Sequence, residues 1–386
     1  MASQKKTVVI FKRKLLAMSE TFIRNQAIAL HNSGTWKPIL LARKKDKKGI
    51  EIPSVEQIYT PSKVGFLEEL FFLFNWPFFG LRKKLKQINP NLIHIHFGTQ
   101  AVKFWPTFKT LNIPTLITLH GADINLYKEY WKNGGKGLAG KFYPKRLLQL
   151  SQHPNTFFIA VSEAIKKRAI EYGVPEEKIK VSYIGTDITR FKPIGVPLLQ
   201  RENRILFIGR FVEKKQPDAL IKAFLKVKEN IPDAELDMIG NGPLLEPCKA
   251  LAKKHNLNIN FLGSLNSEQV ALVLSETKVF CLPSVTAKSG DAEGFGIVLL
   301  EAMASGVPCI TSARGGAGEG VIDGETGICF EENDIESLSL GLIKILSNPE
   351  LAEQFSKSGL KRVQSFFDNR ITSRHLTSIY DELIAN

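Results

Sequence analysis

Two carboxylates, Glu293 and Glu301, are separated by seven residues in a segment that also contains Gly294 and Gly296. The glycines allow a ligand to approach the backbone, and a helix predicted to begin near Gly296 would point its first free N–H groups at the same place. On that helix the second acid would lie up to ~12 Å from the first. The pair therefore suits two ends of one extended ligand and cannot share a proton. By itself, this spacing equally fits an amphipathic helix with solvated acids.

Two basic side chains follow a predicted strand earlier in the same half of the chain. Arg210 and Lys215 come soon after the apolar run 204–208. A guanidinium and an ammonium just beyond a strand end could together neutralise a diphosphate leaving group. Lys214 is an alternative to Lys215, and without other motifs the segment would be interpreted as a solvated basic loop.

A histidine stands at the corresponding place in the first half of the chain. His120 directly follows the apolar run 115–119 and precedes Gly121. This position favours a functional role, although a single histidine is more often a structural one. Asp123 is a weaker candidate, and His94 and His96 alternate on a predicted strand where they could simply be packed.

Short apolar runs alternate with helical patterns along the whole chain. They cover residues 7–11, 38–42, 91–97, 115–119, 157–161 and 179–183, and then 204–208, 235–239, 258–261, 279–282 and 307–311. This alternation predicts α/β domains with doubly wound parallel sheets. The segment 191–204 contains two prolines and a glycine without clear periodicity, so it predicts the boundary between two domains.

Charge differs strongly between the two halves of the 386-residue chain. Residues 1–195 contain 32 Lys and Arg against 13 Asp and Glu, whereas the remainder contains 20 against 25. A basic half could face a pyrophosphate-linked substrate, an anionic membrane or nucleic acid. No nucleic-acid-binding module is recognisable, so no nucleic acid partner is expected.

The four cysteines are scattered without a Cys-x-x-Cys pair, and the histidines show no ligand spacing. The cysteines are expected to be buried thiols in a reducing compartment. No apolar run of the length of a membrane span is present, and the basic N-terminus lacks the apolar region of a signal peptide. A cytoplasmic protein is therefore expected.

Taken together, these segments resemble the retaining nucleotide-sugar glycosyltransferases of family four. The matching segments are the Glu-x7-Glu stretch EGFGIVLLE, the GR…KK segment, the G-x-G-P turn at Gly240 and the GGAGE segment that ends at Glu319. Gln216 departs from the pattern, since the family usually has glycine there. The resemblance implies the GT-B fold, an α/β architecture of two Rossmann-like, doubly wound domains facing across a cleft. Residues 1–192 would bind the acceptor and residues 203–366 the nucleotide-sugar donor, with a C-terminal helix over 367–386 packing back on the first domain.

The resemblance also implies roles for individual residues. The catalytic set would be His120, Arg210, Lys215 and Glu293, and the donor-binding set would be Gly294, Phe295, Gly296 and Glu301. The donor would be a UDP- or GDP-linked sugar, transferred with retention by front-face attack, with no metal and no cofactor. The chain has no Asp-x-Asp motif of the metal-clamped transferase type.

Two alternatives remain open. One is a nucleotide-sugar-binding protein without turnover. The other is an NAD-dependent sugar-modifying enzyme, which would need an early G-x-G-x-x-G. The only similar turn, at Gly240 and Gly242, lies mid-chain and has Leu245 in place of the third glycine.

The loop after the first predicted strand contains the residues SETF, in which Ser19 or Thr21 could cap the following helix and Glu20 would favour its positive end. This segment resembles the colanic-acid-type subgroup that builds bacterial exopolysaccharide and lipopolysaccharide. In that subgroup the loop borders the acceptor, which implies a saccharide or lipid-linked acceptor.

One aromatic-rich stretch, residues 66–86, ends in a basic cluster. It could lie on an anionic membrane surface, or it could be a buried helix pair broken at Pro77. The basic stretch 132–146 is expected to be an exposed loop. Peripheral attachment to the inner face of the cytoplasmic membrane is the corresponding hypothesis.

Overall fold

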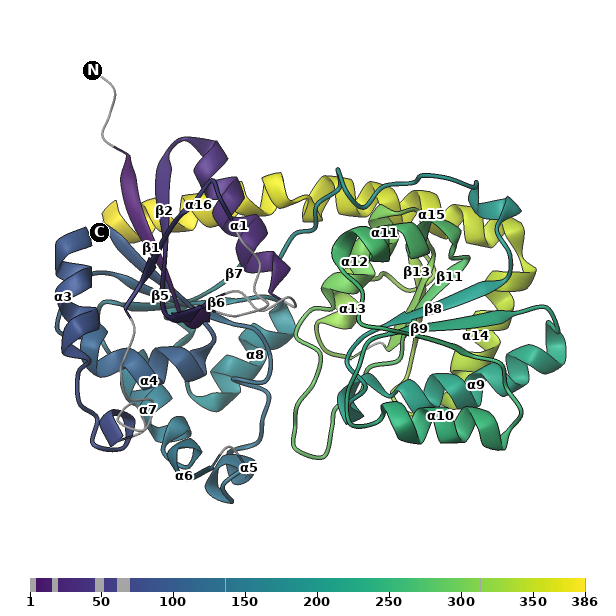
Figure 1. Ribbon diagram of the computed structural model, residues 1–386, viewed down its shortest axis with the longest axis horizontal. Helices are drawn as coiled ribbons and strands as arrows, with labels where there is room; N and C mark the ends of the chain where they lie inside the picture. The colour runs from purple at the N-terminus through teal and green to yellow at the C-terminus, as the bar shows by residue number, and fades with distance from the viewer. Residues whose placement is uncertain are drawn as a thin grey trace. The chain divides into compact units, whose positions relative to one another are not determined.

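The computed structural model describes residues 5–15, 20–45, 52–60, 70–135, 137–312 and 314–385. The chain forms two compact units, one made of Met1–Tyr183 with Asn369–Asn386 and the other of Ile184–Asp368. Each unit contains one sheet whose neighbouring strands pair in parallel, with helices packed against it (Figure 1). The predicted α/β class with two doubly wound sheets is therefore confirmed.

The sheet of the first unit has the order β3-β2-β1-β4-β5-β6-β7. Its strands are β1 Lys6–Leu15, β2 Trp36–Lys45, β3 Glu56–Tyr59, β4 Leu92–His96, β5 Thr115–Leu119, β6 Thr156–Ala160 and β7 Ile179–Val181. Strand β3 was not predicted. It is a four-residue edge strand without a buried side chain, so it lacks the apolar run by which the other strands are recognised.

Strand β1 is buried on both faces because helices cover it from each side. Val8 and Ile10 belong to a core that includes buried residues of α1 (Thr21–Ser33) and α16 (Asn369–Ala385). On the other face, the ring of Phe11 packs edge-on against Phe104 and Phe108 of α4 (Gly98–Phe108), at centroid distances of 4.9 and 5.1 Å. The C-terminal helix α16, yellow in Figure 1, lies beside α1.

The first unit also contains the helices α3 Phe79–Ile88, α5 Lys128–Lys132, α6 Gly137–Gly140, α7 Tyr143–Ser151 and α8 Glu163–Tyr172, with a 3-10 turn at Glu176–Lys178. The prediction of a loop over 132–146 is wrong, because α6 and the start of α7 lie within these residues. Tyr143, Leu147 and Leu150 recur at helical spacing and are buried, and Pro144 is favourable in the first turn of a helix.

The second unit has the sheet order β10-β9-β8-β11-β12-β13. Its strands are β8 Arg204–Ile208, β9 Glu235–Ile239, β10 Asn260–Gly263, β11 Val279–Leu282, β12 Cys309–Ser312 and β13 Gly327–Phe330. Its helices are α9 Pro217–Asn230, α10 Leu245–Lys254, α11 Ser267–Glu276, α12 Ile297–Ala304, α13 Ala317–Gly320, α14 Ile335–Ser347 and α15 Pro349–Arg362, with 3-10 turns at Leu198–Gln200 and Glu213–Lys215 and a π-helical turn at Val363–Phe367. Strand β13 was not predicted, since its four residues begin with glycine.

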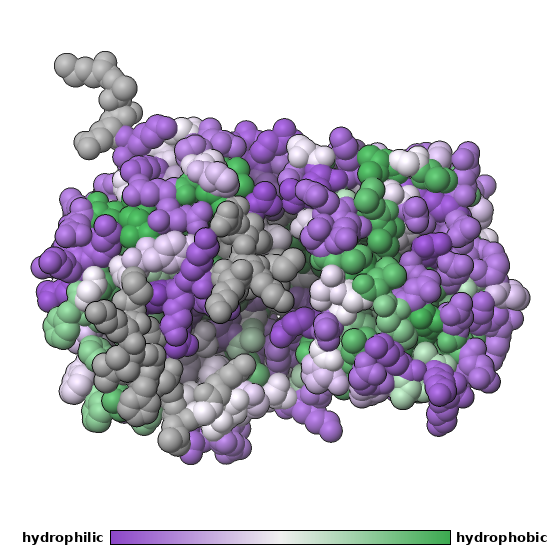
Figure 2. Space-filling view, in the orientation of Figure 1, coloured by the Kyte–Doolittle hydropathy of each residue, from purple (hydrophilic) through white to green (hydrophobic). Residues whose placement is uncertain are grey.

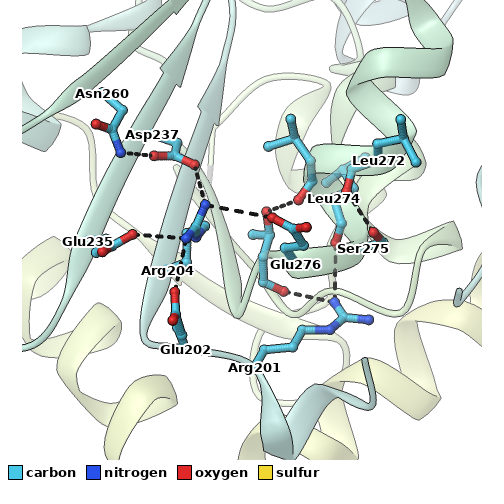
Figure 3. A network of polar contacts seen from close by, with 12 residues as sticks. Arg201, Glu202, Arg204, Glu235, Asp237, Asn260, Leu272, Leu274, Ser275 and Glu276 are labelled. Atoms are coloured by element: carbon cyan, nitrogen blue, oxygen red, sulfur yellow. Dashed lines mark hydrogen bonds and ion pairs between the residues drawn. The ribbon is translucent and has the colours of Figure 1, made fainter. Parts of the chain in front are cut away.

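A cluster of charges surrounds Arg204 at the amino end of β8, away from the strand ends that carry the predicted site (Figure 3). Its guanidinium lies 3.0 Å from carboxylate oxygens of both Glu202 and Glu235, and 3.3 Å from Asp237. Asp237 is only 3% exposed and also accepts a hydrogen bond from Asn260. Although burial alone lowers the pKa of Arg204, the surrounding carboxylates outweigh it and raise that pKa.

We expect Arg204→Ala to lower the free energy of unfolding by ~3 kcal/mol, because it would leave the buried Asp237 without its cation. Urea unfolding followed by circular dichroism measures this loss. Lys249→Ala is the matched control, since Lys249 pairs with Glu246 on the surface and its removal should cost less than ~1 kcal/mol. Equal losses in the two variants would contradict a special role for the Arg204 cluster.

Among the described residues, no helix is both long enough and apolar enough to span a lipid bilayer. Figure 2 shows one face of the molecule, on which hydrophilic residues predominate and hydrophobic residues gather in smaller groups.

Candidate functional site

The predicted donor-site residues of the second unit lie around the point where its strand order reverses. Strands β8 and β11 pair side by side although β9 and β10 separate them in sequence. Lys215 lies in the 3-10 turn after β8, and Glu293 lies in the loop between β11 and α12. Crevices beyond the carboxyl ends of strands at such a switch point are the usual ligand sites of doubly wound sheets.

Lys215 and Glu293 form an ion pair, with side chains 13% and 15% exposed. Lys214 points elsewhere, since its ammonium lies 3.0 Å from a carboxylate oxygen of Asp291. The two alternatives left by the sequence therefore have different partners, and Lys215 is the one that contacts the first acid of the Glu-x7-Glu segment.

The electrostatics of this pair keep Glu293 ionised. Burial by itself raises the pKa of Glu293, but the ammonium groups of Lys215 and Lys214, together with the backbone N–H of Gly294, outweigh it and lower the pKa to about 2. Glu293 is therefore a carboxylate at neutral pH, able to accept hydrogen bonds and unable to donate a proton.

Gln216 adopts a left-handed backbone conformation at φ +43°. The glycosyltransferase family that the sequence resembles usually has glycine at this position, because glycine adopts positive φ at the least cost. The side chain of Gln216 donates a hydrogen bond to Asn333 at 2.5 Å. The substitution thus keeps the turn that ends the 3-10 segment and starts α9.

The turn before α12 is tightly packed. Gly296 has φ +79°, and a Cβ there would lie 3.0 Å from Leu299. Phe295 is buried and its ring meets Phe367 edge-on at 5.4 Å. The buried phenylalanine anchors the turn, while glycine at 296 permits the backbone reversal from which α12 starts.

The glycine-rich loop before α13 lies directly on this turn. A Cβ at Gly316 would be 1.9 Å from the carbonyl oxygen of Gly294, and one at Gly315 would be 3.3 Å from that of Glu293. Arg362 holds the far end of α13 by donating to the carbonyl oxygens of Glu319 at 2.8 Å and Gly320 at 3.1 Å. Sequence analysis missed Arg362, because nothing in the amphipathic pattern of α15 distinguishes it from the other cations of that helix.

Arg210 lies in the loop after β8 and is exposed. No partner of its guanidinium is found within the described part of the chain. The backbone beside it is in close contact with the G-x-G-P turn, since a Cβ at Gly240 would be 1.9 Å from the carbonyl oxygen of Gly209. Arg210 is therefore a cation on a fixed backbone, in the same loop as Lys215.

Glu301 lies on α12 and has the opposite electrostatics from Glu293. Burial raises the pKa of Glu301 to about 8, and Arg190 lowers it only in part. The two acids of one segment thus differ in protonation at neutral pH, with Glu293 ionised and Glu301 protonated in the absence of a ligand.

We expect the affinity for a nucleoside diphosphate to rise between pH 6.5 and 8, by up to ~tenfold per pH unit. In the role that the resemblance implies, Glu301 accepts hydrogen bonds from ribose hydroxyls and must lose its proton, which the free protein retains below about pH 8. The dependence should flatten above pH 8. Isothermal titration across this range measures it, and Glu301→Gln provides the control because it cannot ionise. An equally steep rise in that variant would assign the effect to the nucleotide instead.

His120 belongs to the first unit, where it follows β5. Its Nε2 lies 3.0 Å from Nδ1 of His96, the last residue of β4. The rings of Phe22 and Phe97 pack against it at centroid distances of 4.8 and 4.5 Å. Burial, assisted by the charge of Lys12, lowers the pKa of His120 well below its usual range, so the ring is neutral.

Asp123 supports the backbone around His120. Its carboxylate accepts hydrogen bonds from the backbone N–H groups of Gly98 at 2.8 Å, Gly121 at 2.9 Å and His120 at 3.0 Å. A buried carboxylate held in this way fixes the turn, so a structural role accounts for it. His94 is likewise packed, between the hydroxyls of Thr118 and Tyr380, each at 2.6 Å.

The buried Lys12 forms an ion pair with the half-buried Glu20 near His120, and sequence analysis did not identify this pair. Lys12 is 2% exposed and its ammonium lies 4.7 Å from the centre of the Phe97 ring. The cap predicted for α1 differs from the structure, because Glu20 is the N-cap, makes no side-chain capping bond, and precedes Thr21 as the first helical residue. Ser19 lies outside the described residues. The Glu20 carboxylate, expected only to favour the positive end of the helix, pairs with a buried lysine.

Comparison with known families matches both units. A model described as "Glycosyltransferase Family 4" matches residues 19–190, and one described as "Glycosyl transferases group 1" matches residues 192–362. The two matches together account for most of the chain, and it belongs to the glycosyltransferases of these families.

Individual relatives agree with this assignment. The putative colanic acid biosynthesis glycosyltransferase WcaL of Escherichia coli (strain K12) is 31% identical over 229 residues, which is 58% of this chain and 56% of the relative. The chain thus aligns with little more than half of that relative. The amylovoran biosynthesis glycosyltransferase AmsK of Erwinia amylovora is 27% identical over 76% of this chain and 70% of its own length.

Solved structures confirm the GT-B fold. Sucrose-phosphate synthase from Thermosynechococcus elongatus has a TM-score of 0.79 at 21% identity, covering 99% of this chain and 100% of its own. Anabaena Alr3699/HepE, solved in complex with UDP and glucose, has a TM-score of 0.78 at 16% identity and covers 98% of this chain and 100% of its own.

Proposed function

We propose that this protein is a retaining glycosyltransferase. It moves a sugar from a nucleotide-sugar donor, UDP- or GDP-linked, to a saccharide acceptor that is lipid-linked, in the synthesis of a bacterial cell-surface polysaccharide or lipopolysaccharide. The observation that carries the proposal is the half-buried Lys215–Glu293 ion pair at the switch point of the second sheet. Support for the donor class comes from the HepE complex with UDP-glucose, and support for the pathway class comes from the names of WcaL and AmsK.

In the proposed reaction, the main task of the site is to stabilise the negative charge that develops on the leaving group. Arg210, Lys215 and the first amides of α12 neutralise the departing nucleoside diphosphate. Glu293 accepts hydrogen bonds from the donor sugar, and Glu301 accepts them from the ribose. The acceptor hydroxyl bonds to the anomeric carbon as the bond from that carbon to the phosphate oxygen breaks. The same phosphate oxygen takes the hydroxyl proton on the same face, so configuration is retained without metal or cofactor.

A panel of nucleotide sugars tests the proposal. The purified protein is incubated with UDP-, GDP-, ADP- and TDP-sugars in the presence of a chelator, and both the melting temperature and the released diphosphate are measured. Stabilisation by one nucleotide class with slow hydrolysis is the expected result. Binding without hydrolysis or transfer, even with a range of saccharide acceptors, would favour a nucleotide-sugar-binding protein instead.

A second part of the proposal concerns the membrane. In the first unit, Phe74, Trp76 and Phe79 are 61%, 52% and 65% exposed. They adjoin the cations of α3, which are Arg82, Lys83, Lys84 and Lys86. Part of the predicted stretch, residues 66–69, lies outside the described residues. Exposed aromatic rings beside a cluster of cations fit contact with an anionic lipid surface, where a lipid-linked acceptor is presented.

We expect the double variant Phe74→Ser with Trp76→Ser to bind vesicles of anionic lipid at least about tenfold more weakly, because both rings would lose apolar burial in the interface. Vesicle co-sedimentation measures the change. Leu272→Ser is the matched control, since this leucine is 62% exposed in the other unit and should leave binding unchanged. Unaltered binding of the double variant would show that these two rings do not contact the lipid surface.

A further inference from the structure

One hydrogen bond joins His96 and His120, and its proton can belong to only one of the two rings. The bond runs between Nδ1 of His96 and Nε2 of His120 at 3.0 Å. A neutral imidazole carries one N–H, so the donor in this bond has its other nitrogen bare, and the acceptor has its proton on the other nitrogen. The direction of the bond therefore sets the tautomer of both rings.

Both rings are neutral in this environment. Burial lowers the pKa of His96 well below its usual range, and the neighbouring rings and Lys12 lower it further. The charged groups that adjoin the pair are Lys12, which is ion-paired with Glu20, and Asp123, whose carboxylate is occupied by backbone N–H groups. Among the residues that the structure describes, no other carboxylate is placed to pair with a doubly protonated ring there.

The far nitrogen of His96 decides between the two directions. Nε2 of His96 is buried and has no hydrogen-bond partner among the described residues. A proton on that nitrogen would be an orphaned buried N–H group, which is rarer in proteins than an unpaired acceptor. The proton of His96 is therefore favoured on Nδ1, where it is used in the bond to His120.

We infer that His96 is a positioning residue that fixes His120 as the tautomer protonated on Nδ1. His120 then presents an N–H donor, and no lone pair, on the side of its ring away from His96. That side takes an oxygen acceptor, such as a sugar hydroxyl or a phosphate oxygen, and His120 does not act as a general base there. The identity of the oxygen as part of the donor rests on the proposed function, whereas the tautomer does not.

The packing around the pair leaves little freedom to change this arrangement. The rings of Phe22 and Phe97 pack against His120, and the centre of the His94 ring lies 4.5 Å from that of His96. His94 is itself fixed at both nitrogens by Tyr380 and Thr118. Neither histidine can turn over without displacing these neighbours, so the tautomer of His120 depends on His96.

Two-bond proton–nitrogen NMR spectra of the histidine-labelled full-length protein test the inference directly. The signal missing from His120→Asn identifies His120. We expect the proton of His120 on Nδ1 in the parent protein. This measurement does not depend on whether a variant at position 96 folds. A proton on Nε2 of His120 would overturn the inference. The spectrum reports no turnover, so a correct tautomer with no reaction on any nucleotide sugar would refute the proposed function alone.

Two variants at position 96 test the positioning role. His96→Asn can place an amide N–H where Nδ1 stands and should keep the tautomer. His96→Leu removes the donor, so Nε2 of His120 loses its hydrogen bond and the spectrum should show a mixture of the two tautomers. In kinetics, His96→Leu should lower kcat/KM at least about tenfold with little pH dependence, and His96→Asn should restore most of it. Loss in both variants with an unchanged His120 spectrum would reduce His96 to a packing residue.

Discussion

Lys215→Ala should transfer sugar at least about a hundredfold more slowly than the parent enzyme while remaining folded. The ammonium of Lys215 is placed beside Glu293 at the switch point, where the leaving diphosphate would develop its charge. Charge stabilisation that is realised only in the transition state appears in kcat, so saturating the donor should not rescue the variant. Glu293→Ala should show a loss of similar size, because the carboxylate is the partner that fixes the lysine.

Steady-state kinetics at saturating donor, with circular dichroism to confirm folding, measure these losses. Lys222→Ala is the matched control, since this lysine lies on the adjoining helix α9, pairs with Asp218 on the surface and should leave the rate unchanged. The rate loss of the double variant at 215 and 293 should be smaller than the product of the two single losses, since the effects of residues that act as a unit are not additive. Parent rates in both single variants would refute the assignment of the site.

Most of the sheet architecture could be predicted because strands buried on both faces leave a distinct apolar run. Strands β5, β8, β9 and β11 begin and end at the predicted residues. Strands β3 and β13 escaped because each has four residues and a mixed burial pattern, so their structure comes from pairing with a neighbour. Edge pairing of this kind depends on tertiary contacts that a single sequence does not display.

The residues proposed for the donor site could be chosen from sequence because most of them follow a strand or precede a helix. What sequence could not provide is the difference between the two acids. Glu293 and Glu301 are the same residue type in one motif, yet neighbouring lysines lower the pKa of the first and burial raises that of the second. Protonation depends on which charges the fold brings near, and these lie 78 positions away in the case of Lys215 and Glu293.

The pairing of Lys12 with Glu20 shows the same limit in the first unit. Lys12 of β1 was interpreted only as part of a basic half of the chain, whereas it is 2% exposed and ion-paired. Buried cations are rare without a partner, so only the structure distinguishes this lysine from the solvated ones around it. Arg362 is a comparable case, since its contacts are with backbone carbonyls that have no sequence signature.

Gly316→Ala should abolish most activity through a change of one methyl group. The backbone at this residue has φ −66°, which alanine adopts without strain, so the effect is purely steric. The new Cβ would lie 1.9 Å from the carbonyl oxygen of Gly294 and 2.9 Å from Cα of Phe295. Both neighbours are backbone atoms, and no flexible side chain can yield. The loop and the turn that carries Glu293 must therefore separate by on the order of 1 Å, a displacement that can cost ~100-fold in rate.

Isothermal titration with the nucleoside diphosphate and steady-state kinetics together test this prediction, with Gly320→Ala as the matched control. Gly320 is the last residue of α13, the helix that follows Gly316, but a Cβ there would meet only Leu300, at 3.8 Å, so near-parent activity is expected. If activity falls equally in both variants, α13 tolerates no substitution and the contact with Gly294 is not special. If neither variant changes, the glycine-rich loop can move away without disturbing Glu293, and the donor would have to be held by the loops after β8 and β11 alone.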